Sequence, residues 1–250
     1  MAEKDREASK QIIAFFRKEF GKRKADLAVI GISGGIDSSV TAVLAKRALG
    51  ADRVFGLILP DSSVTPKHDI TDALDLVKLL KIRYEVIELK DIRKDLARSL
   101  PKNKLALGNM LVRMRMILLY YFAAVYHGLV VGTGDKSEIM LGYYTKFGDG
   151  AVDLLPIADL YKSQVRSLAK FLSIPEKIIN KESSARLWKG HTAEKELGLS
   201  YENIDRILRK LENKEPLNNR AEKRIAFRVH KLIEKNTHKK EMPAVCNINL

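Results

Sequence analysis

The sequence has almost no cysteine: the single one, Cys246, lies near the end of the 250 residues. One cysteine cannot form an internal disulfide bond, and it cannot build the cysteine cluster that a structural zinc site needs. The fold must therefore be stabilised by a hydrophobic core. A chain of this length with 46% hydrophobic residues is long enough to bury one.

A long apolar run is also missing. The longest, around residues 116–125, follows Arg113 and Arg115 and is too short to cross a bilayer, so we expect a buried helix there. Residues 1–10 are charged and contain no apolar signal core. We therefore predict a cytoplasmic protein that has no membrane partner.

The formal net charge of +14 suggests a nucleic-acid partner at first sight. Lysine and arginine are, however, spread along the chain and form no basic arm or block. We favour a basic solvated surface that attracts phosphorylated small molecules, and we expect no nucleic-acid partner.

Four short apolar runs rich in β-branched residues predict strands, at residues 27–32, 53–59, 84–89 and 129–132. Helical patterns separate them, the last being a helix over 110–126. Strands that alternate with helices pair in parallel through right-handed crossovers. We predict an α/β fold, an open and mainly parallel sheet with helices on both faces and with ligands at the carboxyl ends of its strands.

The second half of the chain shows no obvious strand. Its patterns predict amphipathic helices over 162–172, 201–211 and 221–236. No repeat and no linker rich in glycine, serine or proline marks an independent domain. We expect a single domain over 1–250, with a nucleotide-binding α/β core over about 1–160 and a helical C-terminal extension over about 161–250.

The first predicted strand runs into a loop typical of phosphate binding. Gly34 and Gly35 allow a tight turn, and the amides and dipole of the helix that follows face an anion. The loop is neither a Walker loop nor a dinucleotide-binding motif. The residues of this predicted phosphate loop, to which the resemblance given below assigns ATP binding, are Gly31, Ile32, Ser33, Gly34, Gly35, Ile36, Asp37 and Ser38.

Asp37 is a carboxylate inside a loop built for polyanions, so it would repel phosphate unless a cation lay between them. Magnesium fits, because it prefers carboxylate and phosphate oxygens. A helix N-cap is the alternative role of Asp37, and the two roles are compatible.

The loop resembles the SGGxDS loop of the N-type ATP pyrophosphatases, which release pyrophosphate and leave AMP on an acceptor oxygen. Three further segments are similar to motifs of the NAD synthetases within that group. They are Gly108-Asn109-Met110-Leu111-Val112-Arg113-Met114-Arg115-Met116, Gly132-Thr133-Gly134-Asp135-Lys136-Ser137-Glu138, and the closing Thr237-His238-Lys239-Lys240 with Pro243. The resemblance covers nearly the whole chain and implies the adenine nucleotide alpha-hydrolase-like fold.

What the resemblance implies is an ammonia-dependent NAD synthetase, a ligase that converts deamido-NAD, ATP and ammonia to NAD, AMP and pyrophosphate. ATP is the co-substrate, and Mg²⁺ would be held by Asp37 and Glu138. Beyond the loop, the ATP contacts would be Thr133, Lys162 and Ser184. The deamido-NAD contacts would be Arg113, Lys146, Asp153, His238 and Lys239.

Asp149 is our candidate for binding ammonia beside the activated carbonyl, although Gly148-Asp149-Gly150 also fits a simple tight turn. Some relatives in this group obtain nitrogen from glutamine through an attached domain with a catalytic cysteine. This chain has no room for a glutaminase domain and has only Cys246. We therefore expect free ammonia, or ammonia from a partner, as the nitrogen source.

The resembled family also implies a homodimer with deamido-NAD at or near the interface. The helix over 110–126 agrees, because it is apolar around much of its circumference. Coverage of that helix by the C-terminal helices of the same chain is the alternative.

One segment departs from the family pattern. Where many members read GQTDE, this chain reads Gly190-His191-Thr192-Ala193-Glu194, and we assign no site residue between Lys189 and Glu196. Two other functions stay open at this point: a tRNA-modifying ATP pyrophosphatase of the same fold, and a non-catalytic nucleotide-binding sensor.

Overall fold

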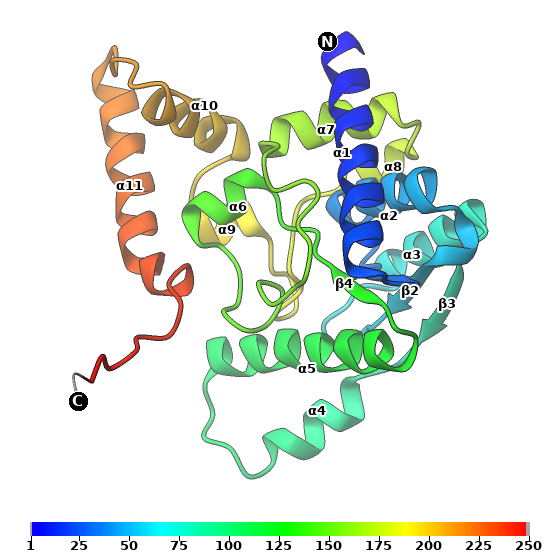
Figure 1. The fold of residues 1–250 in the computed structure, drawn as a ribbon. Coiled ribbons are helices and arrows are strands. Elements are labelled where there is room, and N and C mark those ends of the chain that lie inside the picture. The colour runs from blue at the N-terminus through cyan, green and yellow to red at the C-terminus, as the bar shows by residue number, and fades with distance from the viewer. Residues whose placement is uncertain (1, 249–250) are drawn as a thin grey trace.

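Four parallel strands form the centre of the molecule in the computed structural model, which describes residues 2–248 (Figure 1). The strands are β1 (Ala28–Gly31), β2 (Val54–Ile58), β3 (Arg83–Val86) and β4 (Leu129–Val131). Their order is β3-β2-β1-β4, and every pairing is parallel. The predicted strands and their parallel pairing are confirmed, with ends shifted by a few residues.

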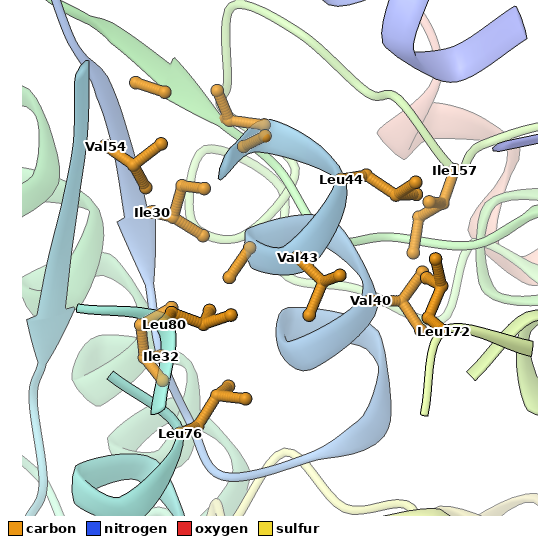
Figure 2. Packing of buried hydrophobic residues seen from close by; sticks show 14 of the residues in the cluster. Ile30, Ile32, Val40, Val43, Leu44, Val54, Leu76, Leu80, Ile157 and Leu172 are labelled. Carbon is orange, nitrogen blue, oxygen red and sulfur yellow. The ribbon is translucent and has the colours of Figure 1, made fainter. Parts of the chain in front are cut away.

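The two faces of the sheet are covered by different helices. Along β1, Ala28 and Ile30 belong to one core cluster and Val29 to another, because successive side chains of a strand point to opposite faces. The first cluster joins the sheet to α1 (Ala2–Arg23), α2 (Ile36–Leu49), α3 (Lys67–Leu80) and α7 (Lys162–Phe171). Figure 2 shows its packing around α2, where Leu44 approaches Ile157.

Helix α5 (Lys104–Val125) covers the opposite face, packing on β1 and β4. It starts six residues before the predicted helix and, by length and composition, is the only described helix apolar enough to cross a membrane. The expectation of a buried helix over 116–125 is wrong for much of that run: Ala123 is buried, but Ile117, Tyr121 and Val125 are exposed, because only one side of α5 faces the sheet. Helices therefore lie on both faces of the sheet, as predicted.

The N-terminal helix α1 was not predicted from the sequence. Its buried residues Ile12, Phe16 and Phe20 are four apart and form one stripe, while charged side chains fill the rest of the surface. The stripe packs on α2 and α7. The high charge of the segment hid this pattern.

The C-terminal part is helical, as predicted, and no strand follows β4 in the residues that the structure describes. Its elements are α6 (Lys136–Leu141), α7, α8 (Glu176–Ile179), α9 (Ala193–Leu197), α10 (Tyr201–Glu212), α11 (Arg220–Asn236) and the short helix η2 (Thr237–Lys239). Helices α6, α9, α10 and α11 share a core cluster of their own. Figure 1 shows α10 and α11 on the side of the molecule away from β3.

The topology places a crevice at the carboxyl end of β1. From β1 the chain crosses first to β2 on one side and later enters β4 on the other. Connections that leave neighbouring strands in opposite directions open a gap above the sheet, where ligands of α/β proteins bind.

Candidate active site

A cavity of about 250 Å³ lies at the carboxyl ends of β1, β2 and β4. Its walls are the loop from β1 to α2, the residues that follow β2 and β4, part of α5, and the segment 181–186. Most residues of the predicted phosphate loop face it, as do Thr133, Glu138, Asp149 and Ser184.

The phosphate loop is shaped by a glycine that no other residue could replace without strain. Gly34 has φ +73°, and a Cβ atom there would lie 2.2 Å from the carbonyl oxygen of Asp69 on α3. Close packing of α3 against the loop thus requires glycine. Gly35 then caps α2 without a side-chain hydrogen bond, which leaves the first amides of the helix directed toward the cavity.

Serine hydroxyls hold this loop in its turn. Ser38 Oγ donates to the Gly35 carbonyl at 3.0 Å and lies 3.1 Å from Ser33 Oγ. Ser39 Oγ also donates to the Gly35 carbonyl, at 2.8 Å. The hydroxyls also accept from the loop itself, Ser38 Oγ from the Ser33 amide at 3.3 Å and Ser33 Oγ from the Gly35 amide at 3.2 Å. The first amides of α2 therefore remain available for an anion.

A buried lysine stands beside the loop. The Lys162 ammonium is fully buried and lies 2.8 Å from an oxygen of Asp37, 2.8 Å from Asp135 and 3.0 Å from Glu138. Tyr201 of α10 places its ring 5.0 Å from the same nitrogen. The predicted residues Asp37, Glu138 and Lys162 are thus brought together, and Asp135 joins them.

Three carboxylates around one ammonium leave an excess of negative charge in a desolvated place. Burial raises the pKa of Asp135 to about 6 and that of Glu138 to about 8, because the ionised carboxylates also repel one another, although Lys162 opposes the shift. The carboxylates raise the pKa of Lys162 well above its ordinary value in spite of its burial. The cluster would accept further positive charge.

The chemistry of these groups fits a magnesium ion that also binds phosphate. Asp37 Oδ1 is buried and has no hydrogen-bond partner. Within residues 2–248, no three His, Cys, Asp or Glu side chains group as a metal site on their own. Two carboxylates, those of Asp37 and Glu138, would therefore share the ion with phosphate oxygens and water, as is usual for Mg²⁺.

Asp149 lines the cavity and is an exposed residue. Its Oδ1 accepts a hydrogen bond of 2.7 Å from the Thr145 amide, and desolvation of the carboxyl by the atoms around it raises its pKa. The segment 145–150 is a tight turn as well, so the two interpretations of this segment are compatible.

The two arginines of α5 lie in different surroundings. Arg115 is in a crowded place: its guanidinium lines the cavity and donates to the carbonyls of Leu59 and Ala185 at 3.1 and 3.5 Å. Arg113 is exposed outside the cavity and donates to the Lys146 carbonyl at 3.1 and 3.2 Å.

The C-terminal tail meets the loop after α6. Lys146 Nζ donates to the His238 carbonyl and, at 3.2 Å, to that of Glu241. Lys239 Nζ donates to the carbonyls of Gly142 and Tyr144 at 2.7 and 2.8 Å. The predicted residues Arg113, Lys146, His238 and Lys239 therefore form one patch outside the cavity, which we call the tail patch.

Asp153 stands apart from the other residues predicted to bind deamido-NAD. Its carboxylate accepts hydrogen bonds from the Val130 amide at 2.8 Å and from the Tyr120 hydroxyl at 3.3 Å. These contacts tie the segment after the turn to the edge of β4.

Several site residues were missed by sequence reasoning. Lys181 and Arg186 line the cavity and pair with the buried Asp69, and Lys181 Nζ also donates to the Gly34 carbonyl at 2.8 Å. No spacing within the sequence links α3 to the segment 181–186. Asp135 had a signal, because it lies inside the motif that supplied Thr133 and Glu138.

Asp205 on α10 holds two site elements in place and was also missed. Its buried carboxylate accepts from Ser137 Oγ at 2.5 Å and from the Ser163 amide at 2.8 Å. Ser137 precedes Glu138, and Ser163 follows Lys162. The C-terminal helix thereby fixes the start of both α6 and α7.

We expect Asp205→Asn to lower the free energy of unfolding by about 1–3 kcal/mol, because the amide nitrogen would face one of two buried donors. Urea unfolding measures the loss. Glu202→Gln, an exposed change on the same helix, is the control and should stay within about 0.5 kcal/mol of the unmodified protein. Equal stability of the Asp205 variant and the control would contradict the assigned role.

Comparison with known proteins identifies the family. The family model described as NAD synthase matches residues 8–243. An NH(3)-dependent NAD(+) synthetase from Staphylothermus marinus is 45% identical over 248 residues, covering 95% of this chain and 90% of the relative.

Solved structures agree with this match. An NMN synthetase from Francisella tularensis has a TM-score of 0.88 and 34% identity, covering 98% of this chain and 99% of that one. An NH3-dependent NAD synthetase from Campylobacter jejuni has a TM-score of 0.83 and 33% identity, covering 97% and 99%. The resemblance seen in the sequence motifs and the expected fold are thus confirmed, and the chain belongs to the NAD synthase family.

Proposed function

We propose that this protein is an ammonia-dependent NAD synthetase that acts in the cytoplasm. It uses ATP to activate the nicotinate carboxylate of deamido-NAD, and ammonia then displaces AMP. The observation that carries the proposal is the meeting of the phosphate loop with Asp37, Glu138 and Lys162 at one cavity above the sheet.

The first step makes the carboxylate reactive. A carboxylate resists attack by ammonia because its leaving group would be oxide. The nicotinate oxygen attacks the α-phosphorus of ATP, the bond from that phosphorus to the bridging oxygen breaks, and pyrophosphate leaves. Amides of the loop at the start of α2 would hold the pyrophosphate, and the Lys162 ammonium would offset the charge that grows on it.

Magnesium would be held by Asp37 and Glu138, and it supplies charge neutralisation and orientation of the phosphates when bound. The unpartnered Asp37 Oδ1 supports this assignment. Asp135 has a different part, because it keeps the Lys162 ammonium beside both carboxylates.

The second step forms the amide. Ammonia attacks the acyl carbon, a carbon–nitrogen bond forms, and the bond to the AMP oxygen breaks. Ammonium must lose a proton before it can attack. Asp149 would bind ammonium beside the carbonyl, and its raised pKa makes the ionised carboxylate a better proton acceptor.

Substrate binding divides between the cavity and its surroundings. Thr133, Lys162 and Ser184, with the loop, would contact ATP from the cavity wall or beside it. The tail patch and Asp153 would contact deamido-NAD. Cations at Lys146 and Lys239 suit a dinucleotide, whose second phosphate and adenosine must extend beyond the reacting nicotinate.

We expect the purified protein to form NAD and pyrophosphate from deamido-NAD, Mg²⁺, ATP and ammonium, and to form none when glutamine replaces ammonium. Pyrophosphate release measures turnover, with reactions lacking deamido-NAD as the blank. Cys246→Ser should leave the rate unchanged, since Cys246 is exposed and far from any assigned role. Efficient use of glutamine would contradict the proposed nitrogen source, and no turnover at all would favour a nucleotide sensor.

NMN synthesis is the second candidate, because the Francisella tularensis protein of that name is so similar in structure. It would be the same amidation on a mononucleotide. The tail patch favours the larger substrate, so kcat/KM with deamido-NAD should exceed that with the mononucleotide acid. The opposite order would transfer the proposal to NMN.

For the metal, we expect Asp37→Asn and Glu138→Gln each to reduce kcat by at least about 100-fold with the fold retained, because each removes one charge that would bind Mg²⁺. Circular dichroism checks the fold, and Mg²⁺ titration of the rate checks the metal. Asp159→Asn, which changes an exposed carboxylate that has no part in the proposed metal site, is the control. Near-normal rates at limiting Mg²⁺ would refute the assignment.

We also propose a homodimer, formed through the outer side of α5 and the neighbouring helix α4 (Lys90–Ala97). The apolar side chains exposed there are Ile92, Leu96, Leu105, Ile117, Tyr121 and Val125. Tyr121, for example, is 62% exposed. Apolar side chains that are exposed together in this way are typical of a surface that binds a partner.

A charge at the centre of a symmetric interface appears twice across the axis. Tyr121→Asp should therefore convert the dimer to a monomer in sedimentation velocity at micromolar concentration. Leu79→Asp, at an equally exposed position on α3, should leave the dimer intact. A wild-type monomer that turns over at full rate would overturn the proposal.

A further inference from the structure

The segment that departs from the family pattern contains a buried histidine. His191 is 2% exposed, follows Trp188 closely, and stands where many relatives have glutamine. Its side chain does not line the cavity. His191 contacts three residues that do: the ring lies against Ser184 and Tyr143, and the main-chain carbonyl accepts from Arg186.

Ser184 Oγ is held by three contacts. Its hydroxyl donates to the His191 carbonyl at 2.5 Å, and the Arg186 amide donates to it at 3.1 Å. The third contact is His191 Nδ1, at 3.2 Å. A hydroxyl has only one hydrogen, and the carbonyl already receives it, so Nδ1 must itself carry the hydrogen of this third bond.

The other ring nitrogen faces an acceptor. His191 Nε2 lies 2.7 Å from Glu196 Oε2 and 3.3 Å from the Tyr143 hydroxyl. Tyr143 already donates its hydrogen to the same Glu196 oxygen, at 2.7 Å. Glu196 and Tyr143 therefore hold the Nε2 side of the ring.

We propose that His191 is a positioning residue for Ser184: held by Glu196 and Tyr143, its ring and its main-chain carbonyl fix Ser184 Oγ at the cavity wall, where Ser184 would contact ATP. The contacts with Nδ1, the His191 carbonyl and the Arg186 amide already use the hydrogen and both lone pairs of the hydroxyl. A contact between Ser184 and ATP would therefore replace one of them.

The surroundings keep this arrangement rigid. The Trp188 ring meets the His191 ring edge-on, with centroids 4.4 Å apart, and Lys104 Nζ lies 4.4 Å from the Trp188 centroid. The Ala193 amide donates to the Ser183 carbonyl at 2.8 Å. The hydrogen bond from His191 also lowers the pKa of Glu196.

The inference rests on the proposed use of Ser184 as an ATP contact, and a double-mutant cycle tests both. The variants are His191→Phe, Ser184→Ala and the pair together, with the exposed His230→Phe as the matched control. Phenylalanine keeps an aromatic ring beside Trp188 but makes no hydrogen bond. The dissociation constant of Mg·ATP is measured by calorimetry for each.

We expect each single variant to weaken ATP binding by roughly threefold to tenfold, the size of one net hydrogen bond. The double variant should bind no more weakly than Ser184→Ala, because His191 acts through that hydroxyl. His230→Phe should bind as the unmodified protein does. Losses that multiply in the double variant, or unchanged binding in His191→Phe, would overturn the role of His191.

A second substitution guards against misfolding of the phenylalanine variant. Glu196→Gln changes the exposed residue that holds His191 Nε2. It should weaken ATP binding when introduced alone, and should have no further effect in a protein that already carries Ser184→Ala. Urea unfolding followed by the emission of Trp188, the only tryptophan, shows whether the segment stays packed. Unchanged binding in Ser184→Ala with normal turnover would remove the ATP role of Ser184 and leave the proposed function standing.

Discussion

The site depends on one buried ammonium and the carboxylates that surround it. A charged group in the interior is costly unless oppositely charged groups compensate it, and Lys162 is compensated by Asp37, Asp135 and Glu138. Asp37 lies in α2, Asp135 and Glu138 lie at the start of α6, and Lys162 begins α7, so three separate parts of the chain meet here. The loop after β1 and the loop after β4 must therefore both lie beside Lys162. If either loop moved away, a charged group would stay buried without its partner.

The helical C-terminal part is a wall of the site and not an appendage. Asp205 fixes Ser137 and Ser163 beside the ammonium cluster, and Tyr201 places its ring against Lys162. Near the C-terminus, Lys239 Nζ donates to the main-chain carbonyls of Gly142 and Tyr144, in the loop that follows α6. We infer that the core over about 1–160 would not keep its metal-binding geometry alone, and this supports our proposal that the chain works as one domain.

Sequence reasoning succeeded where a local pattern carries the information. Alternating strands and helices predicted the parallel sheet, and the glycine pair after β1 predicted a tight turn, which the left-handed backbone of Gly34 makes. Phosphate binding by this loop stays a prediction. Sequence reasoning failed where function depends on a partner distant in the chain. Arg115 lies on the side of α5 that faces the cavity and Arg113 does not, and the local sequence does not show which side that is. Asp205 makes its contacts with residues 40 or more positions away, and nothing in its neighbouring sequence indicates them. The role of His191 likewise needs the positions of Tyr143 and Glu196.

The distribution of charge explains why nucleotide and metal would bind together. The chain carries a formal net charge of +14, which attracts polyanions from a distance. At the end of that path, however, the cavity wall presents Asp37 and Glu138, which repel free ATP at close range. A divalent cation reverses this repulsion, because it binds carboxylate and phosphate oxygens at once. If the proposed metal site holds, long-range attraction and short-range repulsion together would select the metal complex of the nucleotide over the bare nucleotide, with Lys162 as the fixed charge beside both.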